Sequence, residues 1–253
     1  MKILSLGWGV QSFTLAVMSA LGDLEKLDFA IHADTTYERS ETYEFIKKYT
    51  SWLNDYGIKT ITVTNKINQL PEKWANGYNQ VFIPITTLSE KGEKGKLLRT
   101  CTGRWKIAPM RQYLRQIRGD ETIEQWMGIS LDEYQRMKDS DVKYIINKYP
   151  LIEKKMTRND CVNYLSSHNI DIPPKSSCYF CPYHDSTQWR EIQNSQDWEK
   201  AIQVDETIRN IRNGYKSYLH PSAYPITELD FRSEEEKGQL SLWDEECYGI
   251  CGI

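Results

Sequence analysis

The sequence predicts an α/β fold: a doubly wound parallel sheet with a small C-terminal region that carries cysteines. Short apolar strands alternate with helical segments through the first 63 residues, a pattern typical of parallel sheets. The chain has 253 residues, of which 40% are hydrophobic and 26% charged, as in globular proteins. We expect the main α/β domain over residues 1–150 and the cysteine-bearing region over residues 151–253.

Hydrophobic periodicity predicts each element in turn. Residues 2–6 form a strand, 13–21 a helix and 27–33 a second strand that ends at Asp34. The remaining predicted elements are a helix that opens at Ser40 or Thr42, a strand over 58–63, a basic helix over 108–117 and a strand over 123–129.

The segment between residues 65 and 98 has no regular pattern. It contains Pro71, Gly77, Pro84 and a Lys-Gly tract over 91–96. Such a composition is typical of a mobile loop, and this loop could close over a ligand.

Charge is spread unevenly along the chain. The net charge of −3 does not fit a protein that holds nucleic acid with its whole surface. Between Lys91 and Arg118, however, there are nine Lys or Arg residues and one Glu. This basic segment could bind phosphates or be a solvated helix face.

No apolar run approaches the ~20 residues of a membrane-spanning helix. The N-terminus also lacks the apolar region of a signal peptide. We therefore expect a cytoplasmic protein with no membrane partner. In a reducing compartment, six cysteines indicate metal or redox chemistry more than disulfides.

The first strand passes into the first helix through Ser5-Leu6-Gly7-Trp8-Gly9-Val10-Gln11-Ser12. A glycine turn there lets backbone N–H groups approach a phosphate, while the helix N-terminus supplies partial positive charge. The Ser12 hydroxyl would add a donor. The alternative is a tight turn without a ligand, since the segment lacks the Lys and the third Gly of better-known phosphate loops.

This segment resembles the PP-loop, S-G-G-x-D-S, of ATP pyrophosphatases, although Gly7 and Trp8 replace its first two residues. Residues 34–45, DTTYERSETYEF, resemble the D-T-G-x-x-x-x-E-T-Y-x-F segment of phosphoadenylyl-sulfate (PAPS) reductases. Both resemblances imply the HUP fold (adenine nucleotide alpha hydrolase-like), with ATP and Mg²⁺ as ligands. Arg136 is predicted as an anion ligand or, alternatively, a surface salt bridge. The implied nucleotide-binding residues are Ser5, Gly7, Trp8, Gly9, Val10, Gln11, Ser12, Asp34, Thr35 and Arg136.

Cys178-Tyr-Phe-Cys181-Pro182 places two thiols three residues apart, as needed to grip one metal centre. The segment around Cys101 resembles C-C-x-x-x-K-x-x-P-L of APS-type reductases, in which cysteines hold a [4Fe–4S] cluster. Thr100 stands where one ligand is expected, and Cys161 is the candidate replacement; it could instead be a small buried apolar residue. The implied metal ligands, for the cluster or for Zn²⁺, are Cys101, Cys161, Cys178 and Cys181.

Two further sequence features are candidates for catalysis. Lys106 matches the lysine of that segment and could neutralise the cluster or contact phosphate or sulfate. Glu246-Cys247 resembles the mobile E-C-G tail of the reductases, and Cys251 follows, so either thiol could carry a persulfide or be incidental. The candidate catalytic residues are Ser12, Lys106, Cys247 and Cys251.

The resemblance covers residues 1–190 and the last few. It implies an ATP pyrophosphatase that activates an acceptor for sulfur insertion, like the ATP pyrophosphatase components of DNA phosphorothioation systems. A cysteine desulfurase would donate the sulfur, and other subunits of a modification system would present the nucleic acid. One alternative is a sulfonucleotide (PAPS or APS) reductase that produces sulfite. Another is a non-catalytic nucleotide-binding subunit with a structural metal.

Overall fold

A computed structural model describes residues 1–65, 83–211, 213–232 and 236–237. The chain divides into two compact units. Unit 1 comprises residues 1–65 and 103–177, and unit 2 comprises residues 66–102 and 178–253. This grouping differs from the predicted boundary at residue 150. Residues 151–177 belong to unit 1, whereas residues 66–102 belong to unit 2.

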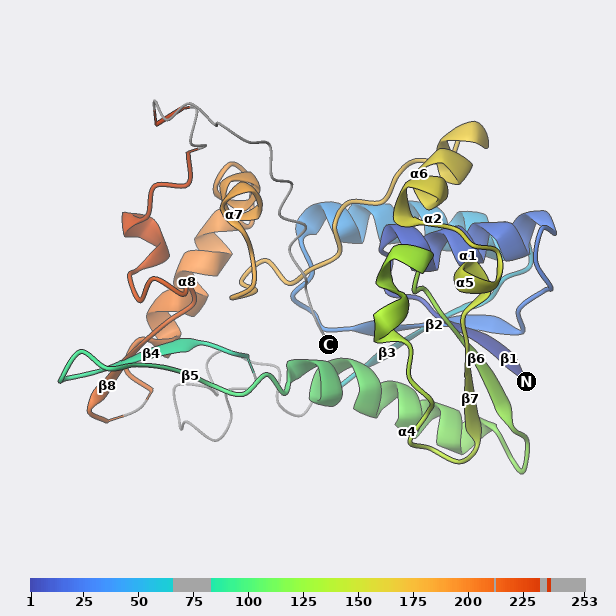
Figure 1. The fold of residues 1–253 in the computed structure, drawn as a ribbon, viewed down its shortest axis with the longest axis horizontal. Helices are drawn as coiled ribbons and strands as arrows, with labels where there is room; N and C mark the ends of the chain where they lie inside the picture. Colours follow the sequence, from blue (N-terminus) through green and yellow to red (C-terminus); the bar gives the residue numbers. More distant parts are fainter. Residues whose placement is uncertain (66–82, 212, 233–235, 238–253) are drawn as a thin grey trace. The chain divides into compact units, whose positions relative to one another are not determined.

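Unit 1 contains every predicted strand and helix up to residue 129 except the irregular segment, and those predictions are confirmed (Figure 1). Its elements are β1 (Lys2–Ser5), α1 (Val10–Leu21), β2 (Phe29–Asp34), α2 (Ser40–Asp55), β3 (Thr60–Thr64), the π-helix η2 (Thr102–Ile107), α4 (Ala108–Ile117), β6 (Ile123–Met127), the 3₁₀ helix η3 (Leu131–Arg136), β7 (Ile145–Lys148), α5 (Pro150–Glu153) and α6 (Arg158–Ser167).

The five strands of unit 1 form a parallel sheet in the order β3-β2-β1-β6-β7. Side chains alternate between its two faces: Ile3 belongs to the apolar core beneath α4, and Leu4 to the core beneath α1 and α2. Figure 1 shows α1 and α2 on one side of the sheet and α4 on the other. The predicted doubly wound α/β fold is therefore confirmed.

Helix α1 is buried along almost its whole length because its residues are mostly apolar. The Phe13 ring lies 5.0 Å from that of Phe45 and 4.8 Å from that of Tyr49, both on α2. The helix ends at Gly22, whose φ of 90° is the left-handed conformation that glycine adopts most readily. Among the described helices, none is both long and apolar enough to cross a bilayer.

The order of the strands creates a switch point beside β1. From β1 the chain builds outward through β2 and β3, and it then returns to add β6 and β7 on the other side of β1. In open sheets of this kind, ligands bind at the carboxyl ends of the two strands that flank the switch point. The loops after β1 and β6 are therefore the first place to look for a site.

Unit 2 contains a three-stranded antiparallel sheet in the order β5-β4-β8. The prediction of a loop over residues 65–98 is wrong for residues 86–96, which form a hairpin that turns at Gly92; residues 66–82 lie outside the described residues. The elements of unit 2 are β4 (Thr86–Ser89), β5 (Lys94–Lys96), α7 (Ser186–Gln193), α8 (Trp198–Ile208), β8 (Tyr215–Tyr218) and the 3₁₀ helix η4 (Ile226–Glu228).

Replacement of Leu4, which lies in the central strand β1, tests the packing of unit 1. Because its side chain is fully buried, we expect Leu4→Ala to lower the free energy of unfolding by about 2–5 kcal/mol in denaturant titrations. Ile146 on the edge strand β7 is 50% exposed, and Ile146→Ala is the matched control, with an expected loss of less than about 1 kcal/mol. Equal losses in the two variants would contradict this description of the core.

Candidate functional site

The loop after β1 is anchored by the side chain of Trp8. Its backbone adopts a φ of 59°, a left-handed conformation that costs a non-glycine residue about 1–2 kcal/mol. The indole is 1% exposed and packs against the rings of Phe13 and Phe45 at 6.0 and 6.3 Å. Burial of this large apolar ring offsets the strain and fixes the path of the loop.

The glycines on either side of Trp8 leave open space. Gly9 has an ordinary φ of −84°, and a Cβ added to it would meet nothing within 4 Å. A Cβ on Gly7 would meet only the Ser12 Oγ, at 3.9 Å. Neither backbone conformation nor packing within the described chain requires glycine here, whereas a ligand that approaches the backbone closely would.

That space lies at the N-terminus of α1. No side chain caps this helix end, and its first turn contains no acidic residue. The first N–H groups of a helix have no partner within the helix and carry partial positive charge, so this end suits an anion. The loop and the helix end together have the form of a phosphate site.

Other predicted loop residues point elsewhere. The Gln11 amide donates to Glu133 at 3.1 Å and accepts from Arg158 at 3.0 Å. Val10 is buried in the core, and the Ser5 hydroxyl lies 3.9 Å from the sulfur of Met110 on α4. The side chains of Gln11, Val10 and Ser5 therefore have partners within the chain, and their predicted roles in nucleotide binding stay predictions.

Ser12 is held within its own helix turn. Its hydroxyl donates to the carbonyl oxygen of Gly9 at 3.2 Å, and its side chain is largely buried. To donate to a phosphate, the hydroxyl would have to leave this carbonyl. The predicted role of Ser12 as a phosphate donor stays a prediction.

A residue that the sequence analysis did not single out fixes the other side of the site. Gly128 follows β6, and a Cβ on it would lie 2.6 Å from the backbone nitrogen of Ser12 and 2.7 Å from its Cα. Only glycine allows this approach, which joins the loops after β1 and β6 at the switch point. In the sequence, its only signal was a glycine near the end of the strand predicted over residues 123–129.

Arg136 lies at the end of η3, in the same loop. Its guanidinium donates to Glu133 at 2.8 Å, and about a third of the side chain is exposed. Glu133 also accepts from Gln11, so Arg136 is connected to the start of α1. The structure thus contains the surface salt bridge that was the alternative prediction for Arg136. A direct role for Arg136 in anion binding stays a prediction.

Asp34 lies at the carboxyl end of β2, where the sequence placed it. One carboxylate oxygen accepts from the Thr36 N–H at 2.7 Å and from the Tyr43 hydroxyl at 2.8 Å. Burial and this hydrogen bond raise the pKa of Tyr43 above its usual value. Thr35 is fully buried, and its hydroxyl accepts from the Tyr37 N–H at 3.3 Å, so Thr35 shapes the turn.

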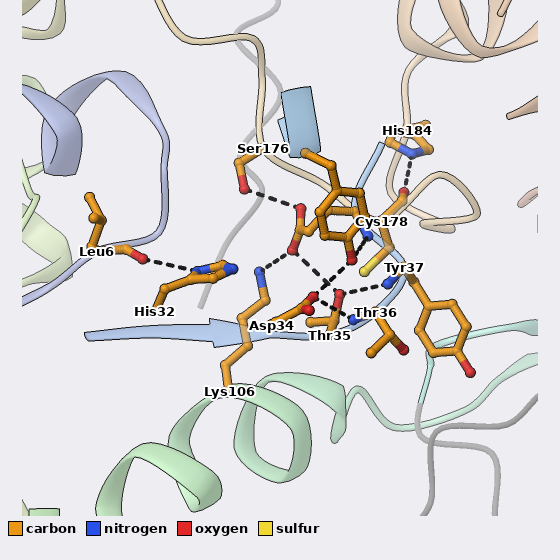
Figure 2. A network of polar contacts seen from close by, with 12 residues as sticks. Leu6, His32, Asp34, Thr35, Thr36, Tyr37, Lys106, Ser176, Cys178 and His184 are labelled. Carbon is orange, nitrogen blue, oxygen red and sulfur yellow. Dashed lines mark hydrogen bonds and ion pairs between the residues drawn. The ribbon is translucent and has the colours of Figure 1, made fainter. Parts of the chain in front are cut away.

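Beside this turn lies a buried carboxylate, Glu38, which the sequence analysis also missed. It accepts from the Lys106 ammonium at 3.2 Å and from the Ser176 hydroxyl at 3.2 Å; these contacts appear as dashed lines in Figure 2. Burial alone would raise the pKa of Glu38. The charge of Lys106, together with the two hydrogen bonds, outweighs this effect and holds the pKa of Glu38 below its usual value.

His32, on β2, lies between this network and the loop after β1 (Figure 2). Its Nδ1 is 3.2 Å from the carbonyl oxygen of Leu6. A carbonyl only accepts, so Nδ1 carries the proton and neutral His32 leaves Nε2 as an acceptor. That Nε2 is buried and has no hydrogen-bond partner among the described residues. In the sequence, the signal for His32 was a titratable side chain within an apolar strand.

Cys161 lies in the apolar core of unit 1. It is fully buried on α6, among side chains of the core beneath α1. Burial raises the pKa of its thiol to about 12, which opposes the thiolate form that a metal requires. The placement favours the second of the two interpretations of Cys161, a small buried apolar residue.

The other described cysteines belong to unit 2. Cys178 and Cys181 share a tight turn in which the Cys181 N–H donates to the Cys178 carbonyl at 3.0 Å; the Nε2 of His184 lies 2.8 Å from the same oxygen. Cys101 directly precedes η2. Within the described ranges, no group of three or more His, Cys, Asp or Glu residues could hold a metal. Cys247 and Cys251 lie outside those ranges.

Comparisons with known proteins add little. No protein-family model matches the sequence, and no curated protein matches it. Among the solved structures that match is a crystal structure of phosphoadenylyl-sulfate (PAPS) reductase from Candida auris in a phosphate complex. It is 13% identical, with a TM-score of 0.45, over 68% of this chain and 74% of that chain. A likeness of this degree assigns neither an activity nor a ligand to this chain.

The burial of His32 predicts a dependence of stability on pH. Burial lowers its pKa, against the charges of Glu38 and Asp34 and together with that of Lys106. The unfolded chain therefore binds the proton more readily, so stability is lost as the pH falls below about 6.5. We expect His32→Gln to remove up to about 1.4 kcal/mol per pH unit of this dependence, measured by denaturant titration between pH 7.5 and 5.5. The exposed His168 provides the control variant His168→Gln, and an unchanged slope in His32→Gln would contradict the prediction.

Proposed function

We propose that this chain is an ATP pyrophosphatase of the PP-loop type, which binds the phosphates of ATP at the N-terminus of α1. The open space at Gly9 is the observation that carries the proposal. It lies at the switch point of the sheet, before an uncapped helix end, where phosphates are typically bound. The resemblance of Gly7–Ser12 to the PP-loop supports ATP as the nucleotide.

In the proposed reaction, an oxygen of the acceptor attacks the α-phosphorus of ATP. The bond from that phosphorus to the bridging oxygen breaks, and pyrophosphate leaves from an adenylated acceptor. The N–H groups of the loop and of α1 stabilise the charge that develops on pyrophosphate, and Mg²⁺ would neutralise it further. Lys106, whose side chain is 36% exposed beside Glu38, is the candidate for a second cationic contact.

Sulfur would then replace AMP. A persulfide on Cys247 or Cys251, supplied by a cysteine desulfurase, attacks the adenylated acceptor through its terminal sulfur, and AMP leaves. The other tail thiol attacks the resulting disulfide, which releases the thiolated acceptor and leaves the two tail cysteines oxidised. By its resemblance to phosphorothioation components, the chain would act on nucleic acid with other subunits of a modification system.

The implied [4Fe–4S] cluster or zinc ion does not fit the described residues. Cys178 and Cys181 offer two thiols on one turn, whereas Cys161 is buried in the core of unit 1. Four ligands are needed for either group. The adenylation reaction proposed above requires neither.

Incubation with candidate substrates tests the function. With ATP, Mg²⁺ and nucleic acid as the acceptor, we expect release of pyrophosphate, measured by a coupled phosphate assay. Sulfite formed from PAPS or APS with thioredoxin would instead show a sulfonucleotide reductase. Binding of ATP without any pyrophosphate would show a nucleotide-binding subunit that lacks this activity.

The variant Gly9→Ala tests the phosphate site without changing the fold. The added Cβ meets no described atom within 4 Å and φ is ordinary, so we expect the melting temperature to stay within about 2 °C. Because the methyl group would occupy the space for a phosphate, the KM for ATP should rise at least about tenfold, the effect of ~1.4 kcal/mol. Gly103→Ala, with equally open surroundings, is the control. A normal KM in Gly9→Ala would place the phosphates elsewhere.

A further inference from the structure

The register of the sheet in unit 2 brings together three lysines that are far apart in the sequence. Leu88 on β4 lies opposite Lys94 on β5 and Lys216 on β8. Two residues along, Thr86 lies opposite Lys96. Residues directly opposite in antiparallel strands, and those two positions along, face the same side of a sheet. Lys94, Lys96 and Lys216 therefore share one face, which we call the lysine face.

The three lysines of the lysine face reach solvent, although Thr86 on the same face is only 6% exposed. On the opposite face, Thr87 is paired with Ser217, and these two side chains are 4% and 0% exposed. All three lysines are exposed. The sheet thus buries small polar side chains on both faces, whereas its three exposed cations all lie on one face.

The hydrogen bonds that Lys94 and Lys216 make with described residues go to uncharged groups. The Lys94 ammonium donates to the carbonyl oxygen of Ser222 at 2.8 Å, and that of Lys216 to the amide oxygen of Asn210 at 2.6 Å. Both acceptors are neutral. None of the ion pairs found in the described ranges joins any of the three lysines to a carboxylate. A group of cations without counter-charges attracts a polyanion.

An aromatic ring lies beside these cations. The Lys96 ammonium is 4.2 Å from the ring centroid of Tyr183, and the Arg99 guanidinium is 5.3 Å from it. The Tyr183 side chain is 38% exposed. Cations that follow phosphates, next to a ring on which bases stack, are the usual components of surfaces that bind single-stranded nucleic acid.

We propose that the lysine face, together with Tyr183, binds single-stranded nucleic acid through its phosphates. Lysines on edge strands also hinder unwanted strand pairing. That role, however, requires neither that all three lie on one face nor that an exposed ring lies beside them. The inference deepens the proposed function, because it gives the nucleic-acid acceptor a place on this chain rather than only on partner subunits.

The test is binding of fluorescently labelled oligonucleotides, measured by anisotropy in the absence of ATP. Single-stranded DNA and RNA of the same sequence form the two arms, and binding of either supports the proposal. In the variant Lys94→Gln/Lys96→Gln/Lys216→Gln, we expect affinity to fall at least about tenfold at low salt. The slope of log K against log salt should decrease by about 2, since each single-strand phosphate contact contributes about 0.7.

A control variant carries the same change of charge in unit 1. Lys47, Lys59 and Lys143 are exposed, and their joint replacement by Gln should leave affinity within about twofold. Tyr183→Ala should weaken binding without changing the salt slope. Equal losses in both triple variants, or no loss in the first, would overturn the proposal. Circular dichroism shows whether each variant is folded. If the triple variant unfolds, Lys216→Gln alone replaces it in the test, with an expected change in salt slope of about 0.7.

One competing occupant is a segment of the chain itself. The wild-type protein could fail to bind either strand while a variant with Asp244, Glu245 and Glu246 neutralised does bind. The chain's own acidic segment would then be the occupant, and the proposal would be overturned. Pyrophosphate release from ATP is measured separately, so failure of the ATP reaction and failure of this surface are distinguishable.

Discussion

The approach of Gly128 to the backbone of Ser12 is the constraint on which the candidate site depends. It closes the loop after β6 against the first turn of α1, with no room for a Cβ between them. Because the loops meet there, Glu133 reaches Gln11, and Arg158 reaches the same amide from α6. The start of α1 is thus held from two directions, and its free N–H groups face a space that Gly9 leaves open.

A second set of contacts holds the loop after β1 from within. Trp8 accepts a left-handed backbone because its indole is buried in the core, and His32 lies against the Leu6 carbonyl just before it. Glu38 then ties Lys106 and Ser176 to the same region. The Glu38 carboxylate is buried with both of these hydrogen bonds in place, so it restricts the conformations open to this region.

Both proposed surfaces attract phosphates, but they do so by different means. At α1 the attraction comes from backbone N–H groups and from a space shaped by glycines. On the lysine face it comes from side-chain charges, two of which are hydrogen-bonded to neutral groups. The net charge of −3 conceals this second surface, because acidic residues elsewhere in the chain outnumber the lysines. An average over a whole chain says little about one face of one sheet.

The sequence by itself determined the strands and helices of unit 1, because periods of 2 and 3.6 and the positions of glycine are local signals. It also placed Gly7–Ser12 and Asp34 at the carboxyl ends of strands. Only the tertiary structure joined Glu38 to Lys106 and Ser176, brought Gly128 against Ser12 and placed Cys161 in the core. The hairpin over residues 86–96 also escaped prediction, since its strands are short and one of them pairs with β8, over 120 residues away. Contacts between distant segments depend on strand order and register, which no local pattern encodes.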